Sequence, residues 1–144
     1  MSIDLKSRAV YPAWANDIVR YRDLDPNAHV SHLAIGEYFE NGRVRLRHQQ
    51  LARLDDDILK GFVLAKLSIQ FNLELHFPGE VSVGTAVSKL GNTSYTLVQG
   101  LFCDDRCIAN SEVITVYMGK ETGRPTPLTD ELRAALQEVA LIEP

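Results

Sequence analysis

Residues 20–43 read RYRDLDPNAHVSHLAIGEYFENGR, and this stretch decides how the rest of the chain is arranged. Its pattern predicts the end of a strand at 18–21, a polar loop at 22–28 and then a long helix. Pro26 fixes its own φ and disfavours helix in the residue before it, so the chain must bend there. The helix therefore begins after the bend, and Ser31 is a suitable N-cap.

The loop carries a carboxylate, Asp25, just ahead of the predicted helix N-terminus. The first turn of a helix has free N–H groups, and these attract developing negative charge. A carboxylate beside such donors is typical of sites for acyl-group chemistry, because the donors can stabilise an oxyanion. We therefore expect acyl-group chemistry at this loop.

Other interpretations of the same loop stay open. Asp23 and Asp25 beside Pro26 are also ordinary turn formers, and Asp23 is expected to tie down the loop. The residue types of Asp23, Asp25, His29 and His32 bind zinc. Their spacing is not that of a zinc site and no partners that would orient such ligands are indicated, so the sequence predicts no metal site.

Composition indicates an ordinary globular chain. The 144 residues are 45% hydrophobic and 24% charged, with a net charge of −4. This length favours one domain over 1–144, and the charge balance gives no general attraction to nucleic acid or to anionic membranes. The N-terminus has no apolar signal region, and no apolar run reaches the length of a membrane span. We therefore expect a cytoplasmic protein.

The two cysteines, Cys103 and Cys107, flank a short turn at 104–106. They could face each other across a hairpin, which makes a disulfide conceivable. A reducing cytosol favours free thiols instead. A zinc site would need a second pair of ligands, and the chain has no further cysteines.

Helical periodicity extends from Leu33 to about Leu54, with one apolar face made of Ile35, Tyr38, Phe39, Gly42 and Leu46. A glycine in mid-helix costs about 1 kcal/mol relative to alanine. Gly42 therefore predicts a close approach of the helix backbone to a sheet. Glu40 and Arg43 are spaced to form an ion pair, and the arginines from Arg43 to Arg53 are expected to form a solvated face.

After an acidic loop at 55–57 the apolar period changes to two. Strands are predicted at 62–75, 81–87, 94–102 and 108–118, separated by turns at 76–80, 91–92 and 104–106. Connections of this length form hairpins, so the sheet is antiparallel.

The ends of the chain are predicted to be an N-terminal arm, residues 1–14, and a C-terminal tail, residues 120–144. The tail contains a short amphipathic helix that begins after Thr129. The order of elements is a strand, a long helix and then a series of hairpins. This order predicts an α+β fold in which one antiparallel sheet wraps around one long helix.

Four segments carry a resemblance to a known family. They are DLDPNAHV at 23–30, FENGR at 39–43, LAKLSIQFNLELHFPGEVSVGTAVSKLGNTSY at 64–95, and GRPTPL at 123–128. Together they resemble the hotdog-fold acyl-CoA thioesterases, specifically the 4-hydroxybenzoyl-CoA thioesterase-like family. The chain departs from the family pattern at Ala28, where many relatives have glycine. It also departs at Ser31 and His32, in place of asparagines, and at Ile35, in place of tyrosine.

The resemblance implies a hotdog fold and assigns roles to the loop. Asp25 is implied as the catalytic carboxylate, acting either as a general base on water or as a nucleophile on the thioester carbonyl. Backbone N–H groups near Val30 and Ser31 would hold the oxyanion. His29 is expected either to orient Asp25 or the attacking water or to bridge the loop and the helix, and His32 is expected to pack against its neighbours or to line the pocket.

The resemblance also implies the substrate and the assembly. The substrate would be a small or medium acyl-CoA. Asn92, Thr93 and Ser94 are candidates for contact with its pantetheine arm, although a polar hairpin turn explains these residues equally well. No cofactor and no metal would be needed, coenzyme A being part of the substrate. Relatives work as homodimers joined edge to edge, often paired into tetramers, with active sites at the subunit interface. No nucleic acid or membrane partner is implied.

Two alternative functions remain. A hotdog dehydratase acting on a 3-hydroxyacyl thioester would need a His–carboxylate pair, which Asp25 and His29 could form. A non-catalytic acyl-CoA binding or sensing module would need a partner domain.

Overall fold

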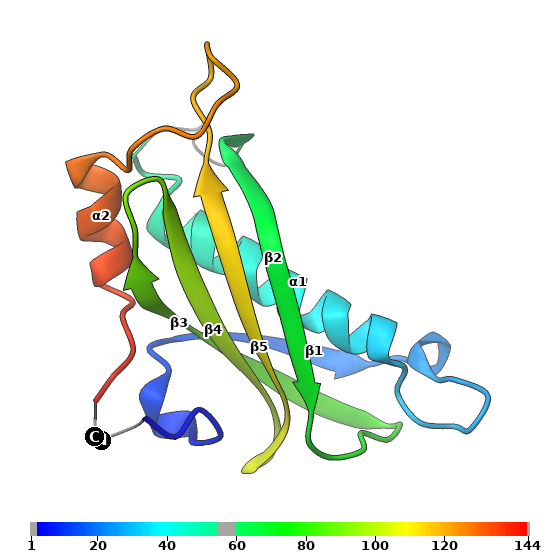
Figure 1. Cartoon of the computed structure of the whole chain (residues 1–144). Coiled ribbons are helices and arrows are strands. Elements are labelled where there is room, and N and C mark those ends of the chain that lie inside the picture. Colours follow the sequence, from blue (N-terminus) through cyan, green and yellow to red (C-terminus); the bar gives the residue numbers. More distant parts are fainter. Residues whose placement is uncertain (1–2, 55–59, 144) are drawn as a thin grey trace.

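A single antiparallel sheet of five strands forms the frame of the molecule, as the computed structural model of residues 3–54 and 60–143 shows (Figure 1). Its strands are β1 (Ala13–Val19), β2 (Phe62–Phe71), β3 (Gly79–Leu90), β4 (Ser94–Cys103) and β5 (Arg106–Tyr117). They lie in the order β1-β3-β4-β5-β2. The hairpins β3–β4–β5 thus form the centre, and β1 and β2 form the two edges. The acidic loop predicted at 55–57 lies outside the described residues.

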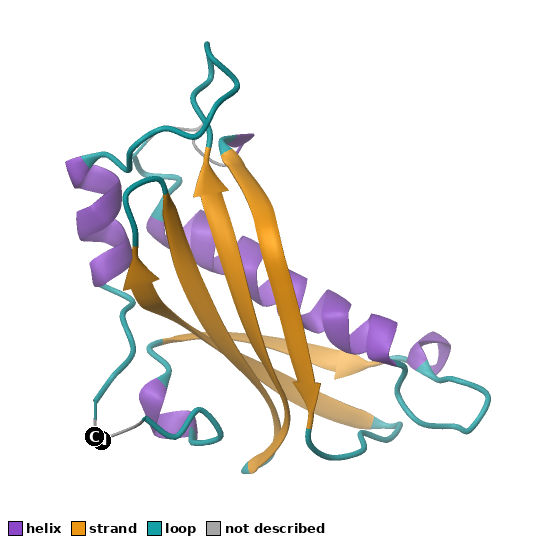
Figure 2. Cartoon of the chain, in the orientation of Figure 1, coloured by secondary structure: helices purple, strands orange, loops and turns teal. Residues whose placement is uncertain are grey.

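The long helix α1 (His32–Gln50) packs against one face of this sheet, so the predicted α+β hotdog architecture is confirmed (Figure 2). The Ser31 hydroxyl accepts a hydrogen bond from the Ala34 N–H at 3.2 Å, which confirms the predicted N-cap. The helix ends at Gln50, four residues before the predicted end. Its buried face consists of Ala34, Ile35, Tyr38, Phe39, Gly42, Arg43 and Leu46.

Gly42 permits a close contact between α1 and the sheet. A Cβ atom at this position would lie 2.7 Å from Cγ1 of Val83 on β3 and 3.1 Å from Nε2 of Gln99 on β4. The first of these separations is shorter than real Cβ contacts, so the helix backbone can lie this near the sheet only if residue 42 has no side chain. The close approach predicted from the sequence is confirmed.

Arg43 differs from the sequence prediction. It is buried rather than solvated, and its Nη1 donates to Oε1 of Gln99 at 3.1 Å. Gln99 in turn donates from Nε2 to the Phe39 carbonyl at 3.0 Å, so the arginine and the glutamine join helix and sheet. Within the described residues no ion pair links Arg43 to Glu40, which is exposed.

Two strand boundaries also differ from prediction. The first strand spans Ala13–Val19 rather than ending at residue 21, because residues Tyr21–Asp23 form a 3₁₀ turn. β2 ends at Phe71 rather than at residue 75. The reason is that the N–H groups of Asn72 and Leu73 both donate to the Ile108 carbonyl, at 2.8 and 3.1 Å, which ends the regular ladder.

The N-terminal segment, together with Leu141, covers the face of the sheet opposite α1. Tyr11 is buried there, and a Cβ atom at Gly84 would lie 2.7 Å from its Cβ. The C-terminal helix α2 (Asp130–Gln137) begins after Thr129, whose hydroxyl accepts from the Leu132 N–H at 3.1 Å, as predicted. Beyond α2, the Ile142 N–H donates to the carbonyl of Val10 at 2.9 Å, so the two terminal segments meet.

The strands differ sharply in exposure. On β4, Leu97 and Leu101 are completely buried, whereas on the edge strand β2 Val63 is 52% and Leu67 45% exposed. One long edge of the sheet therefore presents apolar side chains to its surroundings.

The two cysteines of the β4–β5 hairpin are not joined by a disulfide. Cys103 and Cys107 are both free, and the register pairs them with Arg106 and Phe102 rather than with each other.

Among the described residues, no helix combines the length and the apolar character needed to cross a membrane.

Candidate active site

The loop that follows β1 is tied to the rest of the molecule by main-chain hydrogen bonds. Leu24 and Val30 form an isolated antiparallel bridge across the loop. The Val30 N–H donates to the carbonyl of Leu75 at 2.9 Å, in the segment that follows β2. The loop is therefore a rigid connection between β1 and α1.

Asp23 occupies the buried end of the loop. Its Oδ2 accepts from the Arg20 N–H at 2.9 Å and from the Tyr38 hydroxyl at 2.5 Å. Its carbonyl accepts from the Ser31 N–H at 2.8 Å. These contacts agree with the expectation that Asp23 holds the turn together. Burial, and then the hydrogen bond to Asp23, raise the pKa of Tyr38 well above its ordinary value.

Asp25 lies at the more open end and is half-buried. Its Oδ1 accepts from two main-chain donors, the Asn27 N–H at 2.8 Å and the His29 N–H at 3.1 Å. Its Oδ2 has no hydrogen-bond partner within the described part of the chain. One oxygen thus orients the carboxylate, and the other is free to contact water or a substrate carbonyl.

The turn between these donors requires one residue with a left-handed backbone conformation. Ala28 has a φ of 61°, and its N–H donates to the Asp25 carbonyl at 3.0 Å. This conformation is costly for an alanine and easy for a glycine.

The N-terminus of α1 offers fewer free donors than the sequence indicates. The N–H groups of Val30 and Ser31, predicted to hold an oxyanion, already donate to the carbonyls of Leu75 and Asp23. The N–H groups of the next two residues, His32 and Leu33, have no acceptor among residues 3–54 and 60–143. The available donors are therefore the N–H groups of residues 32 and 33, two residues further along the chain than the predicted pair.

The imidazole of His29 is turned toward a segment that the sequence did not single out. Its Nε2 lies 3.6 Å from Oε2 of Glu74, and its ring centroid lies 5.1 Å from that of His76. The contacts of His29 with Asp25 are made by its main chain: its N–H donates to Oδ1 of Asp25, and its carbonyl accepts from the Asp25 N–H. The alternation of Glu74 and His76 around the apolar Leu75 was the available signal, because alternate residues of an extended chain share a side.

The remaining predicted site residues do not gather around Asp25. The ring of His32 packs edge-on against Phe71, with centroids 6.5 Å apart. The turn at 92–94 lies at the far end of β3, a strand whose length corresponds to about 36 Å. There the Asn92 carbonyl accepts from the Leu128 N–H at 2.9 Å. Within one chain, the structure does not bring these residues to the loop.

The metal ligands that the sequence made conceivable are also separated. Asp23, Asp25 and His32 do not join His29 in a cluster of ligand atoms. In the described part of the chain, the one group that brings three ligand atoms within 4.8 Å of one another is His29, Glu74 and His76.

A hotdog sheet with a carboxylate ahead of its central helix defines a class of protein, the enzymes that act on acyl thioesters. The chain belongs to the thioesterase-like superfamily, whose family model matches residues 19–136. It is a thioester hydrolase, as predicted. No curated protein matches the chain.

Solved structures of similar proteins have the same fold. A thioesterase from Thermus thermophilus, complexed with coenzyme A and Zn, is 26% identical, with a TM-score of 0.79 over 89% of this chain and 93% of that chain. A 1,4-dihydroxy-2-naphthoyl-CoA thioesterase from Synechocystis is 14% identical, with a TM-score of 0.76 over 88% and 96%. A gentisyl-coenzyme A thioesterase is 19% identical, with a TM-score of 0.74 over 86% and 98%.

Proposed function

We propose that this hydrolase cleaves a small or medium acyl-CoA to the free acid and coenzyme A, with Asp25 as its catalytic carboxylate. The observation that carries this proposal is the environment of Asp25. Two main-chain N–H groups hold Oδ1, while Oδ2 is free and the carboxylate precedes the N-terminus of α1. The carboxylate is therefore held in one orientation by hydrogen bonds to one oxygen, and its other oxygen remains available for the reaction.

Asp25 can act in either of two ways. As a general base it takes a proton from water, which attacks the thioester carbonyl; the C–S bond then breaks and the departing thiolate takes the proton. As a nucleophile it attacks the carbonyl itself, the C–S bond breaks to release the coenzyme A thiolate, and the mixed anhydride that remains is hydrolysed by water in a second step, which regenerates Asp25 and releases the acid. Neither route requires a metal, so a chelator should leave hydrolysis unchanged.

The oxyanion formed in either route needs donors that are not already used. The N–H groups of His32 and Leu33 meet this condition, since those of Val30 and Ser31 are occupied. They also lie in the first turn of α1, where the helix dipole favours negative charge. Removing one such donor from an oxyanion site costs about 3–4 kcal/mol of transition-state stabilisation.

The surroundings of the loop suit an acyl group and coenzyme A. Large apolar side chains near it are exposed, namely Tyr21, Leu33, Phe71, Leu73 and Phe77. The relative from Thermus thermophilus was solved as a complex with coenzyme A, which supports the same carrier here.

We further propose that the active form is a homodimer joined through β2, whose apolar side chains are exposed at the sheet edge. Phe71 lies at the end of β2 next to α1, and Phe62 lies at the other end, packed on Tyr95 at 5.7 Å. An antiparallel pairing of two β2 strands would reverse these ends. The turn at 92–94 of the second copy would then lie at the same end of the joined sheet as the Asp25 loop.

Light scattering tests this assembly. We expect a dimer, or a tetramer made of two dimers, at concentrations that support hydrolysis. A stable and active monomer at assay concentrations would contradict the shared site.

The function is tested by incubating the protein with a panel of acyl-CoAs and a thiol reagent. Release of free coenzyme A means hydrolysis, and its complete absence across the panel would overturn the proposal. The dehydratase alternative predicts loss of the substrate hydroxyl without release of thiol. It is disfavoured because the His29 imidazole is directed to Glu74 and not to Asp25.

A single turnover in ¹⁸O-labelled water separates the two roles of Asp25. A nucleophilic carboxylate gains the label when water attacks the Asp25 carbonyl carbon of the anhydride, whereas a general base never gains it, so label in Asp25 identifies the nucleophilic route. Mass spectrometry of the peptide that contains Asp25 gives the answer.

A further inference from the structure

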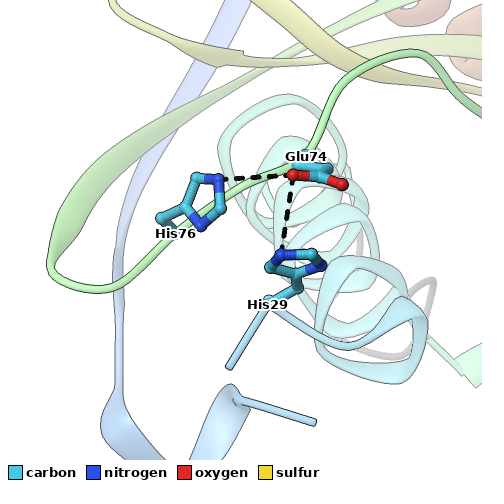
Figure 3. A group of neighbouring side chains, drawn as sticks. All are labelled: His29, Glu74 and His76. Carbon is cyan, nitrogen blue, oxygen red and sulfur yellow. Dashed lines mark ion pairs between the residues drawn. The ribbon is translucent and has the colours of Figure 1, made fainter. Parts of the chain in front are cut away.

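A compact trio of side chains lies on the surface beside the loop, outside the proposed catalytic chemistry. Figure 3 shows the imidazoles of His29 and His76 directed toward the carboxylate of Glu74. We propose that these three residues bind a first-row transition-metal ion of the Zn²⁺ type. The proposal goes beyond thioester hydrolysis and does not depend on it.

The spacing of the ligand atoms carries the proposal. Oε2 of Glu74 lies 3.6 Å from Nε2 of His29 and 3.6 Å from Nε2 of His76. These separations are longer than hydrogen bonds between nitrogen and oxygen, which are about 2.7–3.2 Å. Two ligand atoms on a tetrahedral zinc ion are about 3.3–3.6 Å apart. Glu74 is thus too far from either imidazole for a hydrogen bond and at the separation of two zinc ligands, and the ligand nitrogens of the two histidines lie within 4.8 Å of each other.

The main chain holds the ligands in this arrangement. Val30 and Leu75 are both buried, and the Val30 N–H donates to the Leu75 carbonyl at 2.9 Å. Because successive residues of an extended chain point to opposite sides, Glu74 and His76 lie together on the side that Leu75 does not occupy. His29 is fixed on the other segment by the hydrogen bond from the Asp25 N–H to its carbonyl, at 2.8 Å.

The donor set selects the kind of ion. Two imidazoles and one carboxylate suit Zn²⁺, Co²⁺ and Ni²⁺, whereas Mg²⁺ and Ca²⁺ prefer oxygen ligands only. Three protein ligands leave one tetrahedral position for water. The site is accessible for loading, because the side chains of Glu74 and His76 are 66% and 60% exposed.

The experiment uses the full-length protein and the metal chlorides alone. Calorimetric titration with Zn²⁺ should show one ion per chain, and Co²⁺ should give the visible absorption of a tetrahedral site. Replacing His76→Ala or Glu74→Gln should weaken Zn²⁺ binding by at least ten- to a hundredfold, since losing even an outer-shell partner has this effect. The matched control is His48→Ala, because His48 is exposed on α1 and lies outside the trio.

Thermal melting adds a second measurement. Zn²⁺ should raise the melting temperature of the native protein and of His48→Ala, and not that of the two ligand variants. Far-UV circular dichroism confirms that the variants are folded. An absence of saturable Zn²⁺ binding would overturn the proposal. Binding that survives in both ligand variants would overturn it as well.

Discussion

The loop between β1 and α1 carries two carboxylates, Asp23 and Asp25, that have opposite surroundings. Asp23 is buried, and one of its oxygens accepts from both a main-chain N–H and the Tyr38 hydroxyl. Asp25 is half-buried, and one of its oxygens has no partner in the described part of the chain. Identical side chains two residues apart are thus suited to different tasks, the first to stability and the second to chemistry.

The difference follows from where the donors are. The donors to Asp23 come from a residue before the loop and from α1, so its carboxylate links separate elements. The donors to Asp25 come from Asn27 and His29, within the same turn. A carboxylate that only closes its own turn can take part in a reaction without weakening the attachment of the loop.

The largest expected effect comes from Asp25→Asn. The change keeps the size of the side chain and removes its charge and basicity. We expect kcat to fall by roughly 10²–10⁴-fold, with little change in KM or melting temperature. Steady-state kinetics with an acyl-CoA that the native protein cleaves provides the measurement. A nearly native kcat would remove Asp25 from the proposed mechanism.

Asp23→Asn should show the opposite pattern. Asparagine can still accept hydrogen bonds, but both bonds lose the strengthening that a charged acceptor provides. We expect a loss of about 2 kcal/mol of stability and less than a tenfold change in kcat. Urea unfolding and kinetics on the same preparation measure the two quantities. An inactive variant with native stability would transfer the catalytic role from Asp25 to Asp23.

Tyr38→Phe tests the same hydrogen bond from its donor side, because it removes the hydroxyl that donates to Asp23. The expected loss of stability is about 1.5 kcal/mol. The double variant with Asp23→Asn should lose less than the sum of the two single changes, since both act on the same hydrogen bond. Strictly additive losses would show that Tyr38 and Asp23 stabilise the fold independently.

The same tyrosine predicts a dependence on alkaline pH. Burial and the nearby Asp23 raise the pKa of Tyr38 in the folded state above that of the unfolded chain. The stability that this proton provides is complete below about pH 10 and is lost as the pH rises further. Urea midpoints compared near pH 8 and near pH 10.5 should therefore fall less in Tyr38→Phe than in the native protein. An equal fall in both would assign the alkaline sensitivity to other groups.

The smallest effect is expected at Ala28, whose positive φ shapes the turn around Asp25. Ala28→Gly should raise stability by about 0.5 kcal/mol, because relief of backbone strain exceeds the extra entropy of the unfolded chain. The control is Ala134→Gly on the exposed side of α2, which should lower stability by about 1 kcal/mol. Equal losses at both positions would argue against strain at Ala28.

Sequence reasoning succeeded where one residue determines the outcome. Ser31 caps α1 through its own hydroxyl, and Gly42 contacts the sheet because it lacks a side chain. It failed where distant segments meet. The acceptor for the Val30 N–H is the carbonyl of Leu75, and the partner of Arg43 is Gln99 on β4.

The candidate site shows the same difference between local effects, which were predictable, and contacts between distant segments, which were not. The turn around Asp25 was predictable from Pro26 and its neighbours, because those effects act within a few residues. The contact of His29 with Glu74 was not predictable, since it depends on how the loop docks against the segment after β2. Hydropathy patterns define which residues face a core, but they do not specify which polar groups meet across it.

The order of strands in the sheet also has a consequence for how the chain folds. Neighbouring residues along the chain close the β3–β4 hairpin, where Leu90 pairs with Tyr95. β1 joins only when Ala13 meets Thr85, and β2 joins only across the whole central meander. Loop closure makes such distant pairings slow, so we expect the three central strands to form the folding nucleus and the two edges to be added late. Pulsed hydrogen exchange during refolding should therefore protect the amides of β4 before those of β2.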